Sequence, residues 1–125
     1  MEWSPEKLAT LPHITITVLN GHTSATETYT GVPLFALLEP LGFPAQPHGK
    51  DFRMYLVAEG ADGYSVVYAM AEVIPSIHDA TVLVADAVNG RPLGAIGPFQ
   101  LVATGEKHPA RWVRNLTSIR VEMAH

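Results

Sequence analysis

The chain has 125 residues, which suits a single domain that buries its own hydrophobic core. Its hydrophobic fraction of 47% and charged fraction of 16% are typical of a globular protein. The net charge of -4 argues against a nucleic-acid partner, and no apolar run is long enough to span a membrane. Because the chain has no cysteine, it has neither a thiol nucleophile nor a thiolate ligand for a metal.

The N-terminal part predicts a short helix followed by a hairpin. The run Ser-Pro-Glu at 4–6 supplies a capping residue, a proline for the first turn and an acid, and Pro12 lies beyond the helix end. Residues 13–18 alternate branched apolar residues with threonine, which is the pattern of a half-buried strand. The Asn-Gly pair at 20–21 is a turn signal, so we expect the strand to return over 26–30.

A second helix is predicted after Pro33. Pro40 lacks an amide hydrogen, so the helix should end near Glu39. One apolar stripe at helical spacing should face the core, and its members are Leu34, Leu37, Leu38 and Leu41.

The remaining elements are mostly strands. A glycine-rich turn at 60–63 joins two of them into a hairpin, and residues 70–74 predict a short helix. In the last strand, Ile119 and Val121 should point to one face, and Arg120 and Glu122 to the other. The predicted strands cover residues 53–58, 64–69, 81–85, 99–103 and 117–122.

These elements predict the fold class. Six or seven strands with two or three short helices, and no repeat or linker, indicate one α+β domain over residues 1–125. We expect a mixed, largely antiparallel β domain with short helices.

The sequence lacks the common catalytic motifs. It has no glycine-rich phosphate loop, no Gly-x-Ser-x-Gly elbow and no His-Glu-x-x-His motif. The six histidines are not paired at helical spacing. We therefore predict neither a catalytic residue nor a metal site.

The segment 107–114 is the first candidate site, because it is basic in an acidic chain. Guanidinium groups bind phosphate or carboxylate, and an indole stacks on a flat heterocycle. The alternative is a solvated turn whose tryptophan anchors the last strand. The candidate residues are Lys107, His108, Arg111, Trp112 and Arg114.

Two turns supply further candidates. In the turn at 59–64, a carboxylate from Glu59 or Asp62 could accept paired hydrogen bonds from an aminopyrimidine edge, with Tyr64 beside it. The alternative is that Asp and Gly serve the turn alone. His22 and Arg91 follow Asn-Gly turns and are either ligand contacts or exposed turn residues.

Five segments, in this order, resemble the sulfite oxidase-type molybdopterin-binding domain family. They span most of the chain, from about residue 13 to 122. The segments are Tyr-Thr-Gly-Val-Pro-Leu at 29–34, Ala-Asp-Gly-Tyr-Ser-Val at 61–66, Asn-Gly-Arg-Pro-Leu at 89–93, Gly-Pro-Phe-Gln-Leu-Val at 97–102, and Ala-Arg-Trp-Val-Arg at 110–114 with Ile-Arg-Val at 119–121.

The resemblance implies a mixed, largely antiparallel fold and a ligand groove built from loops. In the family's enzymes, molybdenum is held by a pterin dithiolene and by one cysteine just after the first strand. This chain has no cysteine there, at 18–22, and His22 stands in that region. The resemblance therefore implies a pterin or molybdopterin-like ligand and not a thiolate-held molybdenum.

Our leading hypothesis is a non-catalytic module that binds a pterin or molybdopterin-like heterocycle. Small cysteine-free relatives resemble binders of the bacterial periplasm, so we expect a periplasmic location after loss of an export signal. A membrane-anchored or regulatory protein would be the partner. Trp112 would stack on the ring, Arg111, Arg114 and Lys107 would bind its anionic or carbonyl edge, Asp62 or Glu59 would bind the aminopyrimidine, and His22 would take the cysteine's place.

Two alternatives from other functional classes stay open. One is a molybdenum-dependent oxidoreductase with atypical ligation, which stoichiometric molybdenum would indicate. The other is a structural or regulatory subunit without ligand, which a filled groove and an exposed apolar patch would indicate. A cytoplasmic location is the alternative to the periplasm.

Overall fold

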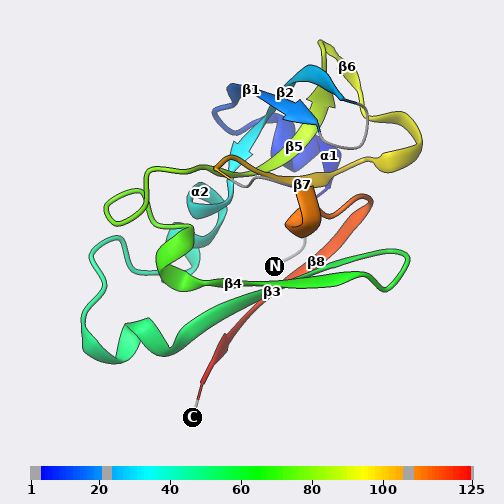
Figure 1. Ribbon diagram of the computed structural model, residues 1–125. Helices are drawn as coiled ribbons and strands as arrows, with labels where there is room; N and C mark the ends of the chain where they lie inside the picture. Colours follow the sequence, from blue (N-terminus) through cyan, green and yellow to red (C-terminus); the bar gives the residue numbers. More distant parts are fainter. Residues whose placement is uncertain (1–3, 21–23, 106–108, 125) are drawn as a thin grey trace.

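The computed structural model describes residues 4–20, 24–105 and 109–124. In this part of the chain, the strands form two antiparallel sheets with short helices around them (Figure 1). This arrangement confirms the predicted mixed, largely antiparallel α+β class. None of the described helices has the length and apolar character needed to cross a membrane.

The larger sheet is built around β5 (Val82–Val88). Its path runs β1 (Ile14–Asn20), β2 (Ala25–Pro33), β5 and β6 (Arg91–Pro92), and β7 (Gln100–Ala103) also pairs with β5. The first four residues of β5 are buried, and its continuous apolar run is typical of a strand covered on both faces. β2 is longer than expected, because its ladder with β5 continues through the Gly-Val-Pro run at 31–33.

The smaller sheet has the order β4 (Ser65–Ala69), β3 (Met54–Gly60) and β8 (Leu116–Met123). The predicted hairpin at 60–63 therefore joins β3 to its neighbour β4. In the β3–β8 register, Val121 lies opposite buried Leu56, and Ile119 lies opposite buried Ala58. Residues opposite each other share a face, so Ile119 and Val121 lie together on the face that carries Leu56 and Ala58, and the prediction that they share one face is confirmed.

Two α-helices have the expected starts. In α1 (Pro5–Ala9), the Ser4 hydroxyl accepts the Lys7 N–H at 3.2 Å, which caps the helix. α2 (Leu34–Leu38) passes into the 3₁₀ turn η1 (Glu39–Leu41), so the chain leaves α geometry where Pro40 predicted. Leu41 is 52% exposed because of this change, and the expected four-residue stripe contributes only three buried leucines. The other 3₁₀ turns are η2 (Gly49–Arg53), η3 (Met70–Glu72), η4 (Gly94–Ile96) and η5 (Pro109–Arg111).

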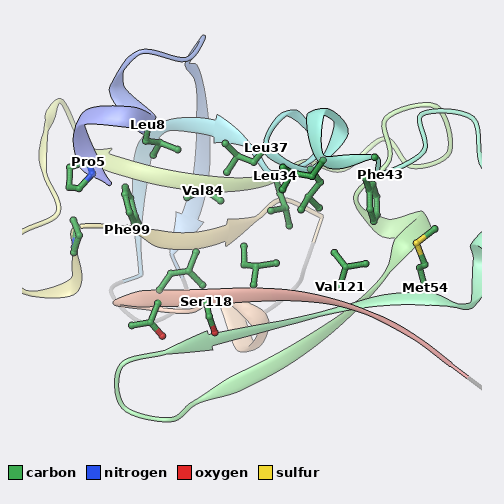
Figure 2. Close-up of a pocket in the computed structure, with 17 residues that line it drawn as sticks. Pro5, Leu8, Leu34, Leu37, Phe43, Met54, Val84, Phe99, Ser118 and Val121 are labelled. Carbon is green, nitrogen blue, oxygen red and sulfur yellow. The ribbon is translucent and has the colours of Figure 1, made fainter. Parts of the chain in front are cut away.

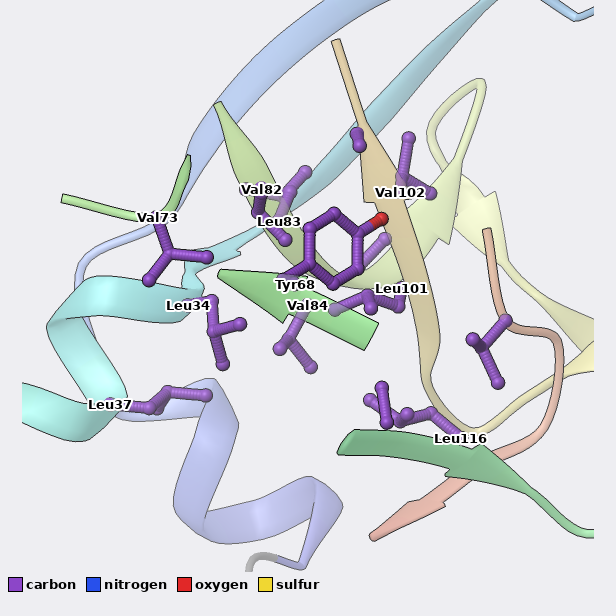
Figure 3. Packing of buried hydrophobic residues seen from close by; sticks show 14 of the residues in the cluster. Leu34, Leu37, Tyr68, Val73, Val82, Leu83, Val84, Leu101, Val102 and Leu116 are labelled. Atoms are coloured by element: carbon purple, nitrogen blue, oxygen red, sulfur yellow. The ribbon is translucent and has the colours of Figure 1, made fainter. Parts of the chain in front are cut away.

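The core fills the space between the sheets (Figure 3). Tyr68 from β4 lies among Leu83 and Val84 of β5 and Leu101 of β7, and all four side chains are buried. Burial of each such leucine or valine stabilises the fold by roughly 1.5–3 kcal/mol. Among the described residues, Gln100 is the buried polar side chain.

β2 and β5 approach each other closely at Gly31. A Cβ atom there would lie 2.2 Å from the carbonyl oxygen of Val84 and 2.6 Å from the Cα of Ala85. The ladder also shifts register between Thr30 and Gly31. No side chain fits at this position unless β5 moves.

Candidate functional site

An apolar groove of about 980 Å³ lies between β8 and the two α-helices (Figure 2). Leu8 of α1 and Leu34 of α2 form buried parts of its wall, and Ile119 contributes from β8. Leu41 and Val121, which are 52% and 44% exposed, lie where the groove meets solvent. The groove therefore has a buried interior and an open, apolar mouth.

The chemistry of the groove is almost entirely apolar. Among the described residues that line it, none carries a charge, and Thr117 and Ser118 have the polar side chains. The Thr117 hydroxyl donates to the carbonyl oxygen of Glu59 at 3.0 Å, so its proton is not available for a hydrogen bond to a ligand. Ligand pockets usually measure about 300–1,000 Å³ and are mainly apolar, so this groove has the size and lining of one.

The sequence contained no signal for this groove. The α2 leucines and the inward residues of β8 show the helical and alternating patterns of core-facing elements. Such patterns show that one face of an element is apolar. They do not show whether that face packs against another element or lines an open groove. Of the residues predicted to bind a ligand, none of those that the structure describes lines the groove.

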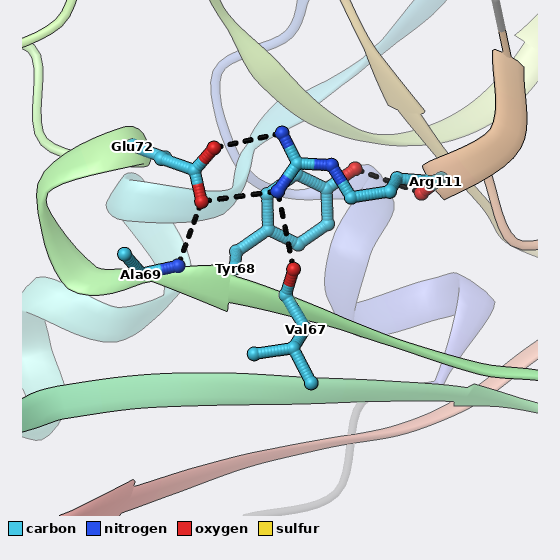
Figure 4. A network of polar contacts seen from close by, with 5 residues as sticks. All are labelled: Val67, Tyr68, Ala69, Glu72 and Arg111. Carbon is cyan, nitrogen blue, oxygen red and sulfur yellow. Dashed lines mark hydrogen bonds and ion pairs between the residues drawn. The ribbon is translucent and has the colours of Figure 1, made fainter. Parts of the chain in front are cut away.

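Arg111 holds η5 against β4 through a polar network (Figure 4). Its Nη1 and Nη2 atoms donate to Glu72 at 3.0 and 2.7 Å, and Nη1 also donates to the carbonyl oxygen of Val67 at 3.1 Å. The guanidinium carbon lies 4.4 Å from the centre of the Tyr68 ring, and the Tyr68 hydroxyl donates to the Arg111 carbonyl oxygen. Arg111 thus already has an anionic partner in Glu72, and its predicted contact with a ligand stays a prediction.

Glu72 is held in its charged form by the same network. The hydrogen bonds from Arg111 lower the pKa of the Glu72 carboxyl, and the N–H of Ala69, at 2.7 Å, adds to this effect. A small cavity of about 110 Å³ adjoins the pair, with His78 and Thr104 in its lining. This cavity holds little more than a few water molecules.

The structure brings two of the predicted site segments together. The Tyr64 hydroxyl donates to the carbonyl oxygen of Ala110, and the N–H of Ala61 donates to the carbonyl oxygen of Asn115 at 3.0 Å. The tip of the β3–β4 hairpin therefore lies against the segment 109–115. Asp62 accepts the Tyr64 N–H at 3.0 Å, which is the turn role given as the alternative.

Trp112 lies in the core, which corrects its expected role as a stacking platform. Its side chain is mostly buried, with 8% of the residue exposed. The ring meets Tyr29 edge-on at 5.4 Å between centroids, and the indole N–H donates to the carbonyl oxygen of Ala103 at 3.0 Å. A ligand has no free indole face to stack on here, and the alternative of an anchoring tryptophan describes this position.

The other predicted residues are dispersed. Arg114 is exposed beside the hairpin, and Glu59 is half-buried in β3. Arg91 is exposed in β6, on the larger sheet, and so belongs to a different part of the fold. His22, Lys107 and His108 lie outside the described residues.

His13 and Asp86 form a pair that sequence reasoning did not identify. His13 Nε2 lies 2.8 Å from Asp86 Oδ2, and His13 Nδ1 lies 2.7 Å from the carbonyl oxygen of Leu11. Both ring nitrogens face oxygen acceptors, and only the imidazolium donates from both nitrogens. The hydrogen bond to Asp86 accordingly raises the pKa of His13.

Gln100 is a second residue that the sequence analysis did not single out. Its side chain is 2% exposed, and its Oε1 atom has no hydrogen-bond partner among the residues that the structure describes. An unpaired buried carbonyl is unfavourable, so this position is an energetic weak point of β7.

No group of three or more His, Asp or Glu side chains in the described ranges is arranged to hold a metal ion. The thiolate that the sulfite oxidase-type family uses for molybdenum is absent from the whole sequence. The donor set of this chain therefore does not fit a thiolate-held molybdenum.

The resemblance to that family rests on the five sequence segments alone. Against the models of known protein families and against curated proteins, the chain has no match.

Proposed function

We propose that the chain is a non-catalytic module that binds a small, predominantly apolar molecule in the groove between β8 and the α-helices. The observation that carries this proposal is the apolar groove of about 980 Å³. Transfer of apolar surface from water into such a site is favourable by roughly 25 cal/mol per Å². The described lining residues offer no charged group and no paired carboxylates for acid–base chemistry, so the groove suits binding rather than turnover.

The walls of the groove come from several separate elements. α1 and α2 lie on one side and β8 on the other, and Phe43, Met54 and Phe99 extend the lining (Figure 2). Aromatic and thioether side chains adapt to flat or flexible apolar ligands. An open groove also argues against the alternative of a ligand-free subunit, whose expected mark is a filled one.

The test is a fluorescence titration with the neutral apolar probe N-phenyl-1-naphthylamine. We expect saturable binding with increased, blue-shifted emission, because the probe leaves water for an apolar site. In the variant Leu41→Glu, a carboxylate stands at the mouth, and we expect the affinity to fall by about tenfold or more.

The matched control is Leu19→Glu. Leu19 is 68% exposed in β1 and does not line the groove, so the same substitution should leave probe affinity unchanged. Equal losses in both variants, or no saturable binding by the wild-type chain, would refute the proposal. Circular dichroism of both variants verifies that they are folded.

A pterin site at the hairpin is the second candidate, and one observation favours it. The hairpin tip carrying Asp62 contacts the segment carrying Arg114, so a carboxylate and an exposed guanidinium occur in neighbouring segments. Such groups suit the aminopyrimidine and carbonyl edges of a pterin. Because Trp112 is buried, this binding would lack the predicted stacking.

Calorimetric titration with oxidised and reduced pterins separates the two candidates. If the hairpin site operates, Arg114→Ala should weaken pterin binding, and the control Arg53→Ala, also an exposed arginine, should not. Leu41→Glu should then leave pterin binding unchanged. Absence of heat with every pterin would rule out this second candidate and leave the groove proposal intact.

A further inference from the structure

One edge of β8 has no strand partner in the described part of the chain. β8 pairs with β3 alone, and β3 in turn pairs with β4. The outer edge of β4 is different, because the Arg111 side chain, from η5, donates there to the carbonyl oxygen of Val67. Exposed strand edges present unpaired backbone groups and are usually protected in this way.

The hydrogen-bond pattern shows which backbone groups of β8 face the free edge. The N–H of Ala124 donates to the carbonyl oxygen of Arg53 at 2.8 Å, in step with the β3–β8 register. In an antiparallel ladder, hydrogen-bonded pairs recur at every second residue. Arg120 and Glu122 therefore bond to β3, and the N–H and C=O groups of the odd-numbered residues point outward.

The residues whose backbone groups point to the free edge are Ile119, Val121 and Met123, and their side chains lie on the groove face of the sheet. Val121 and Met123 are 44% and 50% exposed, so the edge is apolar on its groove side. On the opposite face, Arg120 and Glu122 are joined by an ion pair of 3.2 Å. β8 contains no proline or lysine that would discourage pairing.

We propose that β8 pairs antiparallel with β8 of a second copy of this chain, with Val121 on the twofold axis. The pairing joins the two smaller sheets into one continuous sheet, with both grooves on the same side. Val121 then lies opposite Val121 of the second copy, and Ile119 lies opposite Met123. These odd-numbered pairs use the backbone groups that point outward.

Charge selects this register over its neighbours. With Val121 on the axis, Arg120 of each copy lies directly opposite Glu122 of the other, and opposite charges in that position are favourable. A shift of the axis to residue 120 places Arg120 opposite Arg120, and a shift to residue 122 places Glu122 opposite Glu122. Both shifted registers juxtapose like charges, so the strand complements itself best around Val121.

Sedimentation velocity over a concentration series tests the proposal with matched charge variants. We expect the mass of the wild-type chain to rise from 13.5 kDa toward twice that value as protein concentration increases. Arg120→Glu and Glu122→Arg each create like-charge pairs, so each should weaken the dimer by about tenfold or more. Neither residue lines the groove, so probe binding should persist in both variants.

An equimolar mixture of the two variants is the decisive sample. In the mixed dimer, each glutamate of one copy lies opposite an arginine of the other, so association should return to about the wild-type level. Recovery also shows that both variants fold. A wild-type chain that stays monomeric up to millimolar concentration, or variants that dimerise as well as the wild type, would overturn the proposal.

Discussion

At the scale of single residues, the described part of the protein contains two polar side chains whose surroundings are unusual. Gln100 is buried with an oxygen that has no partner among the described residues, and both ring nitrogens of His13 lie within hydrogen-bonding distance of oxygen atoms. Gln100 lies in one of the five segments that carry the family resemblance and His13 lies in none, but the surroundings of both depend on contacts that only the folded chain creates. Both therefore yield measurements that test the structure directly.

Replacement of Gln100 by methionine should stabilise the fold. Methionine has nearly the same length and removes the unpaired carbonyl, whose burial costs about 1–3 kcal/mol. We expect the free energy of unfolding in urea to rise by about 1 kcal/mol. A loss of stability would instead show that Oε1 is satisfied in solution, by water or by another group.

The His13–Asp86 pair should make stability depend on pH. The pKa of His13 is raised in the folded chain above its ordinary value of 6.5. A raised pKa means that the pair stabilises the fold fully below the unfolded pKa, and that this contribution is lost as pH rises through the folded pKa.

The measurement is urea unfolding of the wild type and Asp86→Asn at about pH 5.5 and about pH 8.5. We expect the variant to be less stable at the lower pH and to approach the wild type at the higher pH. A difference that is the same at both pH values would contradict the charged pair. An NMR titration of His13 gives the folded pKa independently.

At the scale of elements, the sequence predicted features that depend on neighbouring residues. It did not predict contacts between segments that are far apart in the chain. The cap at Ser4, the alternation in β8 and the end of α2 near Pro40 depend on neighbours in the chain, and the structure confirms them. Arg111 and Glu72 are 39 residues apart, so no spacing rule could pair them. The burial of Trp112 likewise depends on Tyr29, from a strand far away in the sequence.

The attachment of η5 to β4 should depend on the shape of the Arg111 side chain. A lysine keeps the charge but cannot bind both Glu72 oxygens, reach the Val67 carbonyl and lie over Tyr68 at once. We expect Arg111→Lys to cost about 1 kcal/mol of unfolding free energy, because the pair is partly exposed.

Arg114→Lys is the matched control for this substitution. Arg114 is exposed three residues away, and its replacement should change stability by less than about 0.5 kcal/mol. Thermal unfolding followed by circular dichroism measures both variants. Equal effects at positions 111 and 114 would show that the network with Glu72 adds no stability.

At the scale of the whole molecule, the two sheets share one core and leave one large apolar groove beside it. Tyr68 of the smaller sheet packs on β5 and β7 of the larger sheet, so neither sheet has a separate interior (Figure 3). The groove lies between α1 and α2 on one side and β8 on the other. The same residues that continue the core thus line the proposed ligand site.

A shared core predicts that the chain unfolds as one cooperative unit. In a Trp3→Phe background, the fluorescence of Trp112 reports the larger sheet, and far-ultraviolet circular dichroism reports the whole backbone. We expect both signals to change together in urea, with one midpoint. Two separate midpoints would mean that the sheets unfold independently and that residues 1–125 form more than one unit.

The contact at Gly31 has a consequence for ligand selection. Its single hydrogen allows β2 to lie against the backbone of Val84, and the side chain of Val84 lines the groove. The position of this groove wall therefore depends on Gly31, which does not itself line the groove. In related sequences, a larger residue at this position would displace β5 and change the width of the proposed ligand site. The size of ligand that the groove accepts could then differ between sequences whose lining residues are identical.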